Sequence, residues 1–436
     1  MGTLGGIYMV KKIEENENNN ELMSEIQEVL SKTKDSSVNR KAESDIQYPT
    51  GFLPLDYKNG HRVAVTLANG SKATYDSIGI LDGTLNMFIG RSGCGKSTIT
   101  YQIGAEIIRP FEHGLMFIDL LEGGMLEERG CSLTGFTKEE FNSRVKIRNA
   151  GITIESVYLQ IKAIHDVKID NEERFRYDTG LIDSHGKHIT KFVPTVYIID
   201  SIPLLTSAKI SEEEQLSGQM STTATAKQLA QLFRRCNQLI KEANIIILAV
   251  NHITQKIEIN AFTHTKSQTA YLKQDETLPG GVTPLYLANM VFRLDDGTKL
   301  TSDKEFGIDG AHVIVSNVKS RAGMSGMNSA VDLILNYNIG FDRDLSLYMM
   351  LKNAGKVNGS GAYLYFGTRD DKKFSQKQFK NKLMTDPEFL NIFIEECYKH
   401  LYDELSYMEE ITKMQSSTTT SSIMDRVRKM NIIETA

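Results

Sequence analysis

The sequence predicts an α/β fold with a mostly parallel central sheet, followed by a small α/β domain near the carboxyl terminus. Apolar runs alternate along the chain with stretches at helical spacing, which is the pattern of strands that are covered by helices. Two of the runs, 196–199 and 245–250, are almost continuously apolar, as is typical of central parallel strands. A glycine-rich loop between the first strong strand and the first strong helix is the third observation.

The regular elements follow one another from residue 48 onward. Strands are expected at 85–89, 115–119, 145–149, 195–200, 245–250, 290–294, 312–318 and 330–336, and helices at 96–108, 155–166, 219–243 and 343–354. The polar stretch 170–191 is interpreted as an inserted hairpin or loop. Four domains are predicted: an amino-terminal segment (1–47), a core (48–339), a small carboxyl-terminal domain (340–405) and a flexible tail (406–436). A short helix at 21–33 of the first segment is expected to dock on a neighbouring subunit, the alternative being a frayed leader.

The glycine-rich loop fits the phosphate-binding pattern G-x-x-x-x-G-K-[ST]. The residues that match it, together with the one that follows, are Gly90, Arg91, Ser92, Gly93, Cys94, Gly95, Lys96, Ser97 and Thr98. A strand before the loop and a helix after it let backbone N–H groups converge on phosphates. Lys96 is predicted to reach the β- and γ-phosphates and the Ser97 hydroxyl to bind Mg²⁺, so the predicted cofactors are ATP and Mg²⁺.

Polar residues end three of the predicted strands. Asp200 closes an apolar strand and is predicted to hold Mg²⁺ with its water shell, the alternative being a solvated strand-end carboxylate. Asp119 ends another strand and Glu122 follows three residues later. A carboxylate there can orient or deprotonate the water that attacks the γ-phosphate, the alternative being a loop carboxylate that faces solvent. Asn251 and His252 end a third strand and are expected to face the γ-phosphate.

Bulk composition narrows the class of protein less than the motifs do. The 436 residues are 40% hydrophobic and 24% charged, and the four cysteines form no C-x-x-C pair, so a reducing cytoplasm is expected. No apolar run has the length of a membrane span, and no secretory signal pattern is present. A net charge of −5 neither supports nor excludes nucleic-acid binding, which depends on local charge.

The order of these motifs resembles the RecA family of DNA strand-exchange recombinases, and within it the phage UvsX type. The resemblance is carried by segments spread over residues 48–403: 117–119, 198–201, 251–253, 280–281 with 286–288, 319–321, 340–343, 361–363 and 386–387. It implies a RecA-like P-loop ATPase core. Glu122 is then the catalytic carboxylate, although the family places its glutamate one residue earlier, where this chain has Leu121. This displacement requires either a bulged loop or weak hydrolysis.

The resemblance also implies how DNA and neighbouring subunits are contacted. Residues 207–218 and 254–279 correspond to the two loops that line the DNA axis of the family's filaments. The implied DNA-binding residues are Lys209, Lys256, Phe262, Lys266, Lys273, Gly280 and Gly281. In the second loop three lysines are balanced by Glu258, Asp275 and Glu276. Lys319 and Arg321 are implied to contact the γ-phosphate of an adjacent subunit's ATP, which makes hydrolysis depend on assembly.

An ATP-dependent recombinase is therefore expected. It would form homo-oligomeric helical filaments on single-stranded DNA and pair the bound strand with homologous double-stranded DNA. Loader and single-strand-binding proteins are further expected partners, and no membrane is. Two alternatives stay open at this point: a RecA-like hexameric helicase, and an ATP-binding filament or scaffold protein with little hydrolysis.

Overall fold

The computed structural model describes residues 46–66, 72–182, 188–208, 219–255, 269–303, 305–321 and 329–413. The compact unit to which they belong begins at Ile46. The helix predicted at 21–33 lies outside the described residues. Of the tail predicted at 406–436, residues 406–413 belong to a helix that ends at Lys413, and the rest lies outside the described residues.

A nine-stranded sheet forms the centre of this unit, in the order β17-β16-β15-β14-β5-β11-β10-β6-β7. One part is parallel from β14 to β7, and comprises β14 (Met290–Leu300), β5 (Leu85–Gly90), β11 (Ile245–His252), β10 (Thr195–Asp200), β6 (Leu115–Leu120) and β7 (Val145–Arg148). The antiparallel part adds β15 (Gly310–Ser320), β16 (Val331–Asn336) and β17 (Gly340–Asp342). The predicted α/β class with a mostly parallel sheet is thus confirmed.

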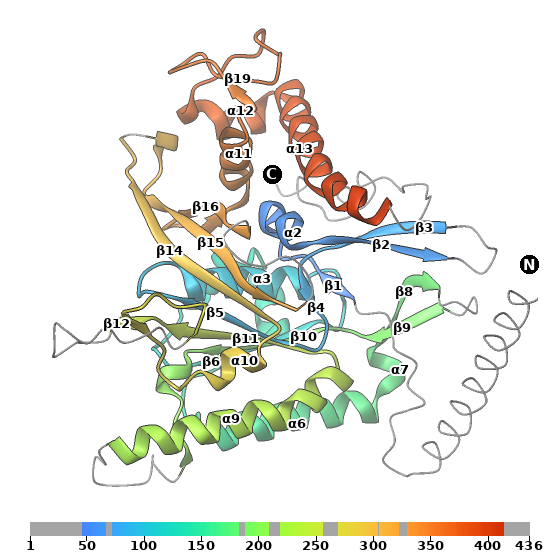
Figure 1. Cartoon of the computed structure of the whole chain (residues 1–436), viewed down its shortest axis with the longest axis vertical. Coiled ribbons are helices and arrows are strands. Elements are labelled where there is room, and N and C mark those ends of the chain that lie inside the picture. The colour runs from blue at the N-terminus through green and yellow to red at the C-terminus, as the bar shows by residue number, and fades with distance from the viewer. Residues whose placement is uncertain are drawn as a thin grey trace, which may run out of the picture. The chain divides into compact units, whose positions relative to one another are not determined.

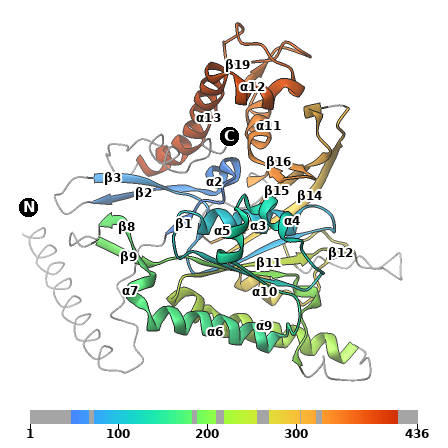
Figure 2. The same ribbon diagram turned by 180° about the vertical axis from the view of Figure 1, so that it is seen from behind.

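Helices cover both faces of the sheet (Figures 1 and 2). On one face, α3 (Lys96–Ile108) packs over β5, β6, β10 and β11, with α4 (Glu127–Thr134) and α5 (Lys138–Arg144) beside it. The other face is covered by α6 (Ile154–Asp170) and α9 (Gln219–Glu242). Burial on both faces explains why β10 and the first seven residues of β11 are buried throughout, and why their sequences do not alternate.

Local sequence signals begin several of these helices. Thr153 and Ser156 form a capping box at the start of α6, and Thr137 and Glu140 form another at the start of α5. Most predicted elements agree with the observed bounds to within a few residues. The exception is β14, which is longer than expected because it continues with β15 as a hairpin beyond the sheet towards the carboxyl-terminal elements (Figure 1).

The polar stretch between α6 and β10 contains a short helix and a hairpin, as one of the two interpretations predicted. These are α7 (Glu172–Phe175), β8 (Arg176–Ile182) and β9 (His188–Phe192). The hydroxyls of Tyr177 and Tyr48 lie 2.9 Å apart, and Lys191 pairs with Asp82 at 2.8 Å. These contacts attach the hairpin to β1 (Gln47–Tyr48) and to the turn after β4 (Ile80–Leu81).

The carboxyl-terminal elements surround a cluster of phenylalanines. They are α11 (Arg343–Asn353), β18 (Val357–Asn358), β19 (Tyr365–Phe366), α12 (Phe379–Thr385) and α13 (Pro387–Lys413). The cluster also includes Leu53 and Tyr57 of α2 (Leu53–Asn59), and α13 packs on α2 and on the hairpin of β2 (His61–Thr66) and β3 (Lys72–Ser77). β17, expected in the small domain, pairs with β16 of the central sheet. The domain division at 339/340 stays a prediction.

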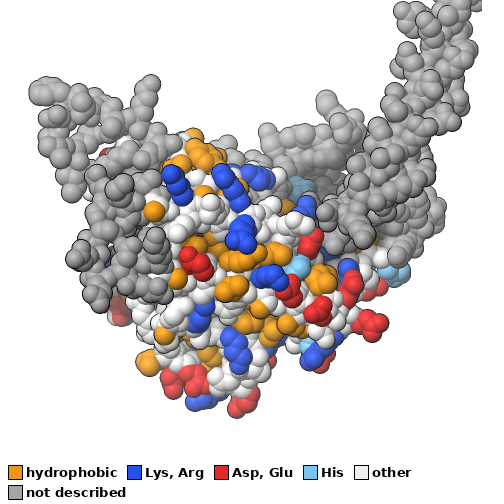
Figure 3. All heavy atoms as spheres, turned by 90° about the horizontal axis from the view of Figure 1, so that it is seen from below, with side chains coloured by type: hydrophobic (Ala, Val, Ile, Leu, Met, Phe, Trp, Pro, Cys, Tyr) orange, Lys and Arg blue, Asp and Glu red, His pale blue; other side chains and the backbone are white. Residues whose placement is uncertain are grey.

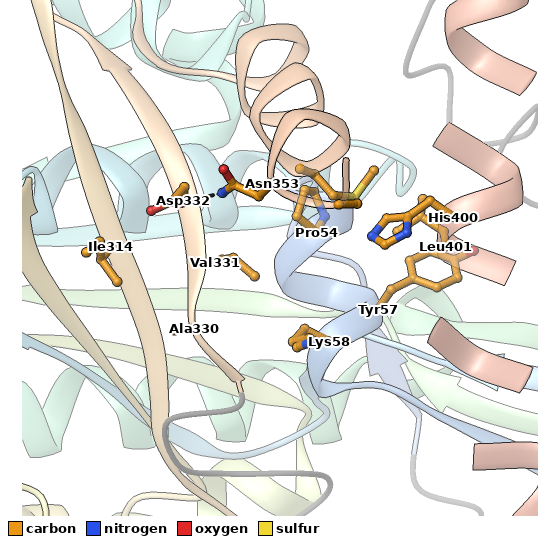
Figure 4. Close-up of a pocket in the computed structure, with 12 residues that line it drawn as sticks. Pro54, Tyr57, Lys58, Ile314, Ala330, Val331, Asp332, Asn353, His400 and Leu401 are labelled. Carbon is orange, nitrogen blue, oxygen red and sulfur yellow. Dashed lines mark hydrogen bonds between the residues drawn. The ribbon is translucent and has the colours of Figure 1, made fainter. Parts of the chain in front are cut away.

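A pocket of about 410 Å³ lies where α2, β16, α11 and α13 meet (Figure 4). Tyr57 and Leu401 line one part of it, and Asn353 donates a hydrogen bond to Asp332 on the other side. The pocket marks the junction between the sheet and the carboxyl-terminal elements, and none of its lining residues belongs to the phosphate-binding loop.

Figure 3 looks onto the face formed by α6 and α9. Basic, acidic and apolar side chains are mixed there. Leu159 and Val167 of α6 are exposed apolar side chains. No helix among the described residues is both long enough and apolar enough to span a bilayer.

Lys168 is an ionisable side chain enclosed by the core between α6 and the sheet. Its side chain is buried, and its Nζ donates to the carbonyl of Val193 (2.6 Å) and to the hydroxyl of Thr195 (3.1 Å). Burial lowers the pKa of Lys168 to about 7, since removing water from an ammonium group disfavours its charged form.

This burial predicts a stability that rises with pH above neutrality. Between about pH 7 and the ordinary lysine pKa of 10.5, the unfolded chain holds a proton that the folded protein has lost. Stability therefore rises with pH across this window, by at most about 1.4 kcal/mol per pH unit. Lys168→Met should lack this contribution in urea unfolding at about pH 7, 8 and 9. Lys162→Met, at an exposed position of the same helix, should keep the wild-type slope; equal slopes for all three proteins would contradict the prediction.

Candidate nucleotide site

The phosphate-binding loop connects the end of β5 to the start of α3, as its sequence predicts. Gly95 has φ of +86°, and a Cβ there would lie 2.8 Å from the ring of Phe341, so both the backbone and the packing require glycine. Arg91, Ser92 and Gly93 are exposed, and nothing lies within 4 Å of a Cβ built on Gly93. The loop thus opens to solvent where phosphates are expected, with the amino terminus of α3 behind it.

Lys96 lies beneath this loop. Its side chain is buried, and Nζ donates to the carbonyl oxygen of Arg91 at 2.6 Å. Burial lowers its pKa, while Cys94, Glu122 and Asp200 act in the opposite direction. A loop carbonyl is a weak partner for an ammonium group compared with a phosphate, so Lys96 is placed to exchange this bond for a charged ligand.

The carboxyl ends of four neighbouring strands bring the predicted polar residues to the same edge. In the order β5-β11-β10-β6, these strands end at Gly90, His252, Asp200 and Leu120. His252 is in register with Gly90, and Ile253 N–H donates to the Gly90 carbonyl at 2.9 Å. Ligands of open α/β sheets bind at this edge, which makes it the candidate nucleotide site.

Asp200 is almost fully buried, with 2% of its surface exposed. Its Oδ2 accepts a hydrogen bond from the hydroxyl of Tyr101, whereas its Oδ1 has no hydrogen-bond partner. Burial raises the pKa of Asp200, and the nearby hydroxyls of Tyr101 and Ser97 act against this rise. A buried carboxylate oxygen without a partner beside a serine hydroxyl fits Mg²⁺, which is commonly held by one or two carboxylates together with nucleotide phosphates. Within the described part of the chain, no cluster of three acidic, histidine or cysteine side chains could hold a metal alone.

Glu122 lies beside His252 despite its displaced position in the sequence. Its Oε1 is 2.5 Å from Nε2 of His252 and also accepts a hydrogen bond from Ser201. Burial acts to raise the pKa of Glu122, but the hydrogen bonds from Ser201 and His252 outweigh it and the net pKa is lowered. β6 continues through Leu120, and Leu121 N–H bonds to the Asp200 carbonyl, so the chain turns outward only at Glu122.

Asp119, the other carboxylate considered for the attacking water, is occupied elsewhere. Arg148 donates to both of its oxygens at 2.7 Å, and the hydroxyl of Tyr197 donates to Oδ2 at 2.5 Å. With 1% of its surface exposed, Asp119 is a buried structural partner of β7 and β10. Both of its oxygens are therefore engaged by Arg148 and Tyr197.

The segment after His252 begins a two-stranded ribbon. β12 (Thr254–Gln255) pairs with β13 (Glu276–Thr277), and these strands are the stem of the second predicted DNA loop. Glu276 is almost fully buried, and Arg293 of β14 donates to both of its oxygens at 2.7 and 2.8 Å. The sequence predicts that Glu276 balances a lysine of the loop. Its charge is instead paired with Arg293, so it does not offset the loop lysines. Arg293 lies on β14, in register with Ile89 of β5, and β12 follows β11 directly. The stem is therefore attached to β14 and β11, the two strands that flank β5.

Removing the cation of this pair should be costly. Arg293→Gln leaves the Glu276 carboxylate buried without its partner, which typically costs about 3–5 kcal/mol of stability. The double variant Glu276→Gln, Arg293→Gln removes both charges and should recover most of that loss in urea unfolding. If the single and double variants were equally unstable, the buried carboxylate would not be the cause.

Lys319 and Arg321 close the carboxyl end of α10 (Thr283–Leu287) in their own chain. Lys319 Nζ donates to the carbonyls of Leu285, Tyr286 and Ala288 at 2.6–2.7 Å, and Arg321 donates to that of Tyr286. Burial, with Arg321 adding to the effect, lowers the pKa of Lys319 to about 8. Lys319 is in register with Val291, which pairs with Met87, about 10 Å along β5 from the phosphate loop. Contact with an adjacent subunit stays a prediction.

The residues expected to bind DNA are only partly described. Lys209, Lys256, Phe262 and Lys266 lie outside the described residues. Lys273 is exposed, and Gly280 and Gly281 form a left-handed turn that packs against Leu229 and Ala226 of α9. Asn251 donates to the carbonyl of Pro279 next to this turn, at 3.1 Å. Their role in DNA binding stays a prediction.

Two neighbours of the site were not assigned a role from sequence. Tyr101 contacts Asp200, and the signal for it was its position four residues after Ser97, which places both side chains on one face of α3. Arg293 contacts Glu276, and the signal was a charged residue inside the otherwise apolar run 290–294.

Comparison with known proteins points in the same direction as the fold. No family model matches the chain. Two bacterial sequences are similar to it, Protein RecA of Acholeplasma laidlawii strain PG-8A and Protein RecA of Acholeplasma laidlawii. Each is 23% identical over 281 residues, which span 62% of this chain and 78% of the relative. The mostly parallel sheet with helices on both faces is consistent with a RecA-like core.

Proposed function

We propose that this chain is an ATP-dependent recombinase that assembles on single-stranded DNA and catalyses homologous pairing and strand exchange. The observation that carries the proposal is the meeting of Lys96, Asp200, Glu122 and His252 at one edge of the sheet. The distant similarity to RecA supports the same assignment. The finer expectation of a phage-type member rests on the sequence resemblance alone.

The nucleotide is held by the residues of the phosphate loop and the ends of the adjacent strands. Backbone N–H groups of residues 91–97 and the amino terminus of α3 face its phosphates, and Lys96 supplies a positive charge to them. Ser97 and Asp200 would hold Mg²⁺, which neutralises charge on the phosphate oxygens when bound.

Glu122 acts on the water that attacks the γ-phosphate. Because hydrogen bonds from Ser201 and His252 keep its pKa low, the carboxylate is ionised at neutral pH and can accept a hydrogen bond from that water. Lys319 and Arg321 of a neighbouring subunit add positive charge to the phosphates in the assembled filament, as an arginine finger supplied in trans does.

The link from nucleotide to DNA passes through His252. This residue contacts Glu122 on one side and is followed, after Ile253, by the stem of the second DNA loop. A γ-phosphate that draws His252 away from Glu122 shifts β12, and with it the loop that holds the unpaired strand. DNA is gripped through its backbone and stacked bases, so the bound strand remains free to pair with a homologous duplex.

Phosphate release with and without single-stranded DNA tests this function. The recombinase should hydrolyse ATP slowly alone and faster with single-stranded DNA, and electron microscopy should show filaments on that DNA only when ATP is present. Closed rings that unwind a forked duplex would instead identify a hexameric helicase. Nucleotide-dependent assembly without DNA-stimulated turnover would identify a scaffold protein.

A further inference from the structure

Tyr101 lies one helical turn beyond Ser97 on α3, and its side chain is almost fully buried in the core between α3 and the sheet. Its hydroxyl donates to Oδ2 of Asp200, which lies at the end of β10. The phenol ring is packed among apolar residues of this core, and this packing holds the hydroxyl next to the carboxyl end of β10.

The two oxygens of Asp200 are therefore not equivalent. Oδ2 is occupied by Tyr101, while Oδ1 is buried and has no hydrogen-bond partner. A carboxylate that was free to rotate could satisfy either oxygen with any nearby donor. By holding Oδ2, Tyr101 fixes the rotation of the carboxylate. Oδ1 then points away from the Tyr101 hydroxyl.

We propose that Tyr101 is a positioning residue for the metal of the nucleotide site: by holding Oδ2 of Asp200, it aims the unpartnered Oδ1 at the Mg²⁺ that accompanies the nucleotide. The inference rests on the proposed function, because it assumes that a metal–nucleotide complex binds between Ser97 and Asp200. Hydrogen-bond partners of metal ligands commonly contribute about 10- to 100-fold to metal affinity.

A second buried tyrosine–aspartate pair in the same sheet provides a matched control. The hydroxyl of Tyr197 donates to Oδ2 of Asp119 at 2.5 Å, and both residues are buried. There, however, Arg148 bonds to both carboxylate oxygens, so Asp119 has no oxygen left for a metal. Tyr197→Phe removes a comparable hydrogen bond without touching the metal position.

The experiment compares the wild-type chain with Tyr101→Phe, Tyr197→Phe and Asp200→Asn. Binding of Mn²⁺ in the presence of a non-hydrolysable ATP analogue is followed by the loss of the free Mn²⁺ resonance in electron paramagnetic resonance. Affinity for the same analogue is measured separately with EDTA present. Thermal unfolding reports the structural effect of each substitution.

We expect Tyr101→Phe to weaken Mn²⁺ binding about 10- to 100-fold and to leave the metal-free nucleotide affinity unchanged. Tyr197→Phe should bind Mn²⁺ as the wild type does, even if it lowers the melting temperature as much. Wild-type Mn²⁺ affinity in Tyr101→Phe, with loss in Asp200→Asn, would overturn the positioning role and leave the proposed function intact. A wild-type chain that bound neither metal nor nucleotide would overturn both.

Discussion

Replacing Lys96 with alanine is expected to abolish ATP hydrolysis and ATP-dependent filament formation on single-stranded DNA. Lys96 is the buried cation beneath the phosphate loop, and in the described structure it bonds only to the loop carbonyl of Arg91 and, weakly, to the Cys94 sulfur. Its charge is therefore available to the β- and γ-phosphates. Removing a group aimed at developing charge typically costs about 10²- to 10³-fold in rate, and the loss of nucleotide binding adds to this.

Phosphate release, nucleotide affinity and electron microscopy of DNA complexes measure this effect. Lys241→Ala provides the control, because Lys241 is an exposed lysine in the last turn of α9 and should behave as the wild type. Lys96→Ala removes a lysine that is attached to the loop rather than to a carboxylate, so it should retain its fold. Normal strand exchange by this variant would contradict the proposed function.

Glu122→Gln is expected to stop hydrolysis while ATP binding and assembly continue. Glutamine has the size of glutamate and can still accept a hydrogen bond from Ser201, but it cannot take up a proton from the attacking water. Loss of a positioned general base commonly lowers the turnover rate by about 10²- to 10⁴-fold. Filaments formed by this variant with ATP should persist longer than those of the wild type, since their nucleotide is not consumed.

The measurement is single-turnover hydrolysis together with filament lifetime on single-stranded DNA. Glu127→Gln is the matched control, because Glu127 lies five residues further on and contacts Lys138 and Asn142 at the surface. Near-normal hydrolysis by Glu122→Gln would show that this carboxylate is not the base. If the wild type were equally slow, the chain would be a scaffold protein.

The nucleotide loop and the class of fold were predictable because their signals are local or periodic. The phosphate-binding pattern requires a strand, a turn and a helix within about twenty residues, and all three are written consecutively in the chain. Continuous apolar runs identified β10 and β11 because burial on both faces removes any alternation. The candidate residues Lys96, Ser97 and Asp200 followed from their places relative to these elements.

Other features of the site depended on contacts between residues distant in sequence. Glu122 comes one residue later than the family pattern, and only the turn after β6 places it against His252, 130 positions away. Asp119 ends the same strand, but Arg148 and Tyr197 occupy its oxygens. The pairing of Glu276 with Arg293 likewise turned a presumed loop charge into a buried anchor.

What the sequence determined by itself is therefore the scaffold and the phosphate loop, since hydrophobic periodicity and glycine geometry act over short stretches of chain. Which carboxylates are free for chemistry and which are tied into ion pairs was decided by the tertiary structure alone. The physical reason is that a buried carboxylate takes its role from the partner it meets, and strand order brings that partner from far along the chain.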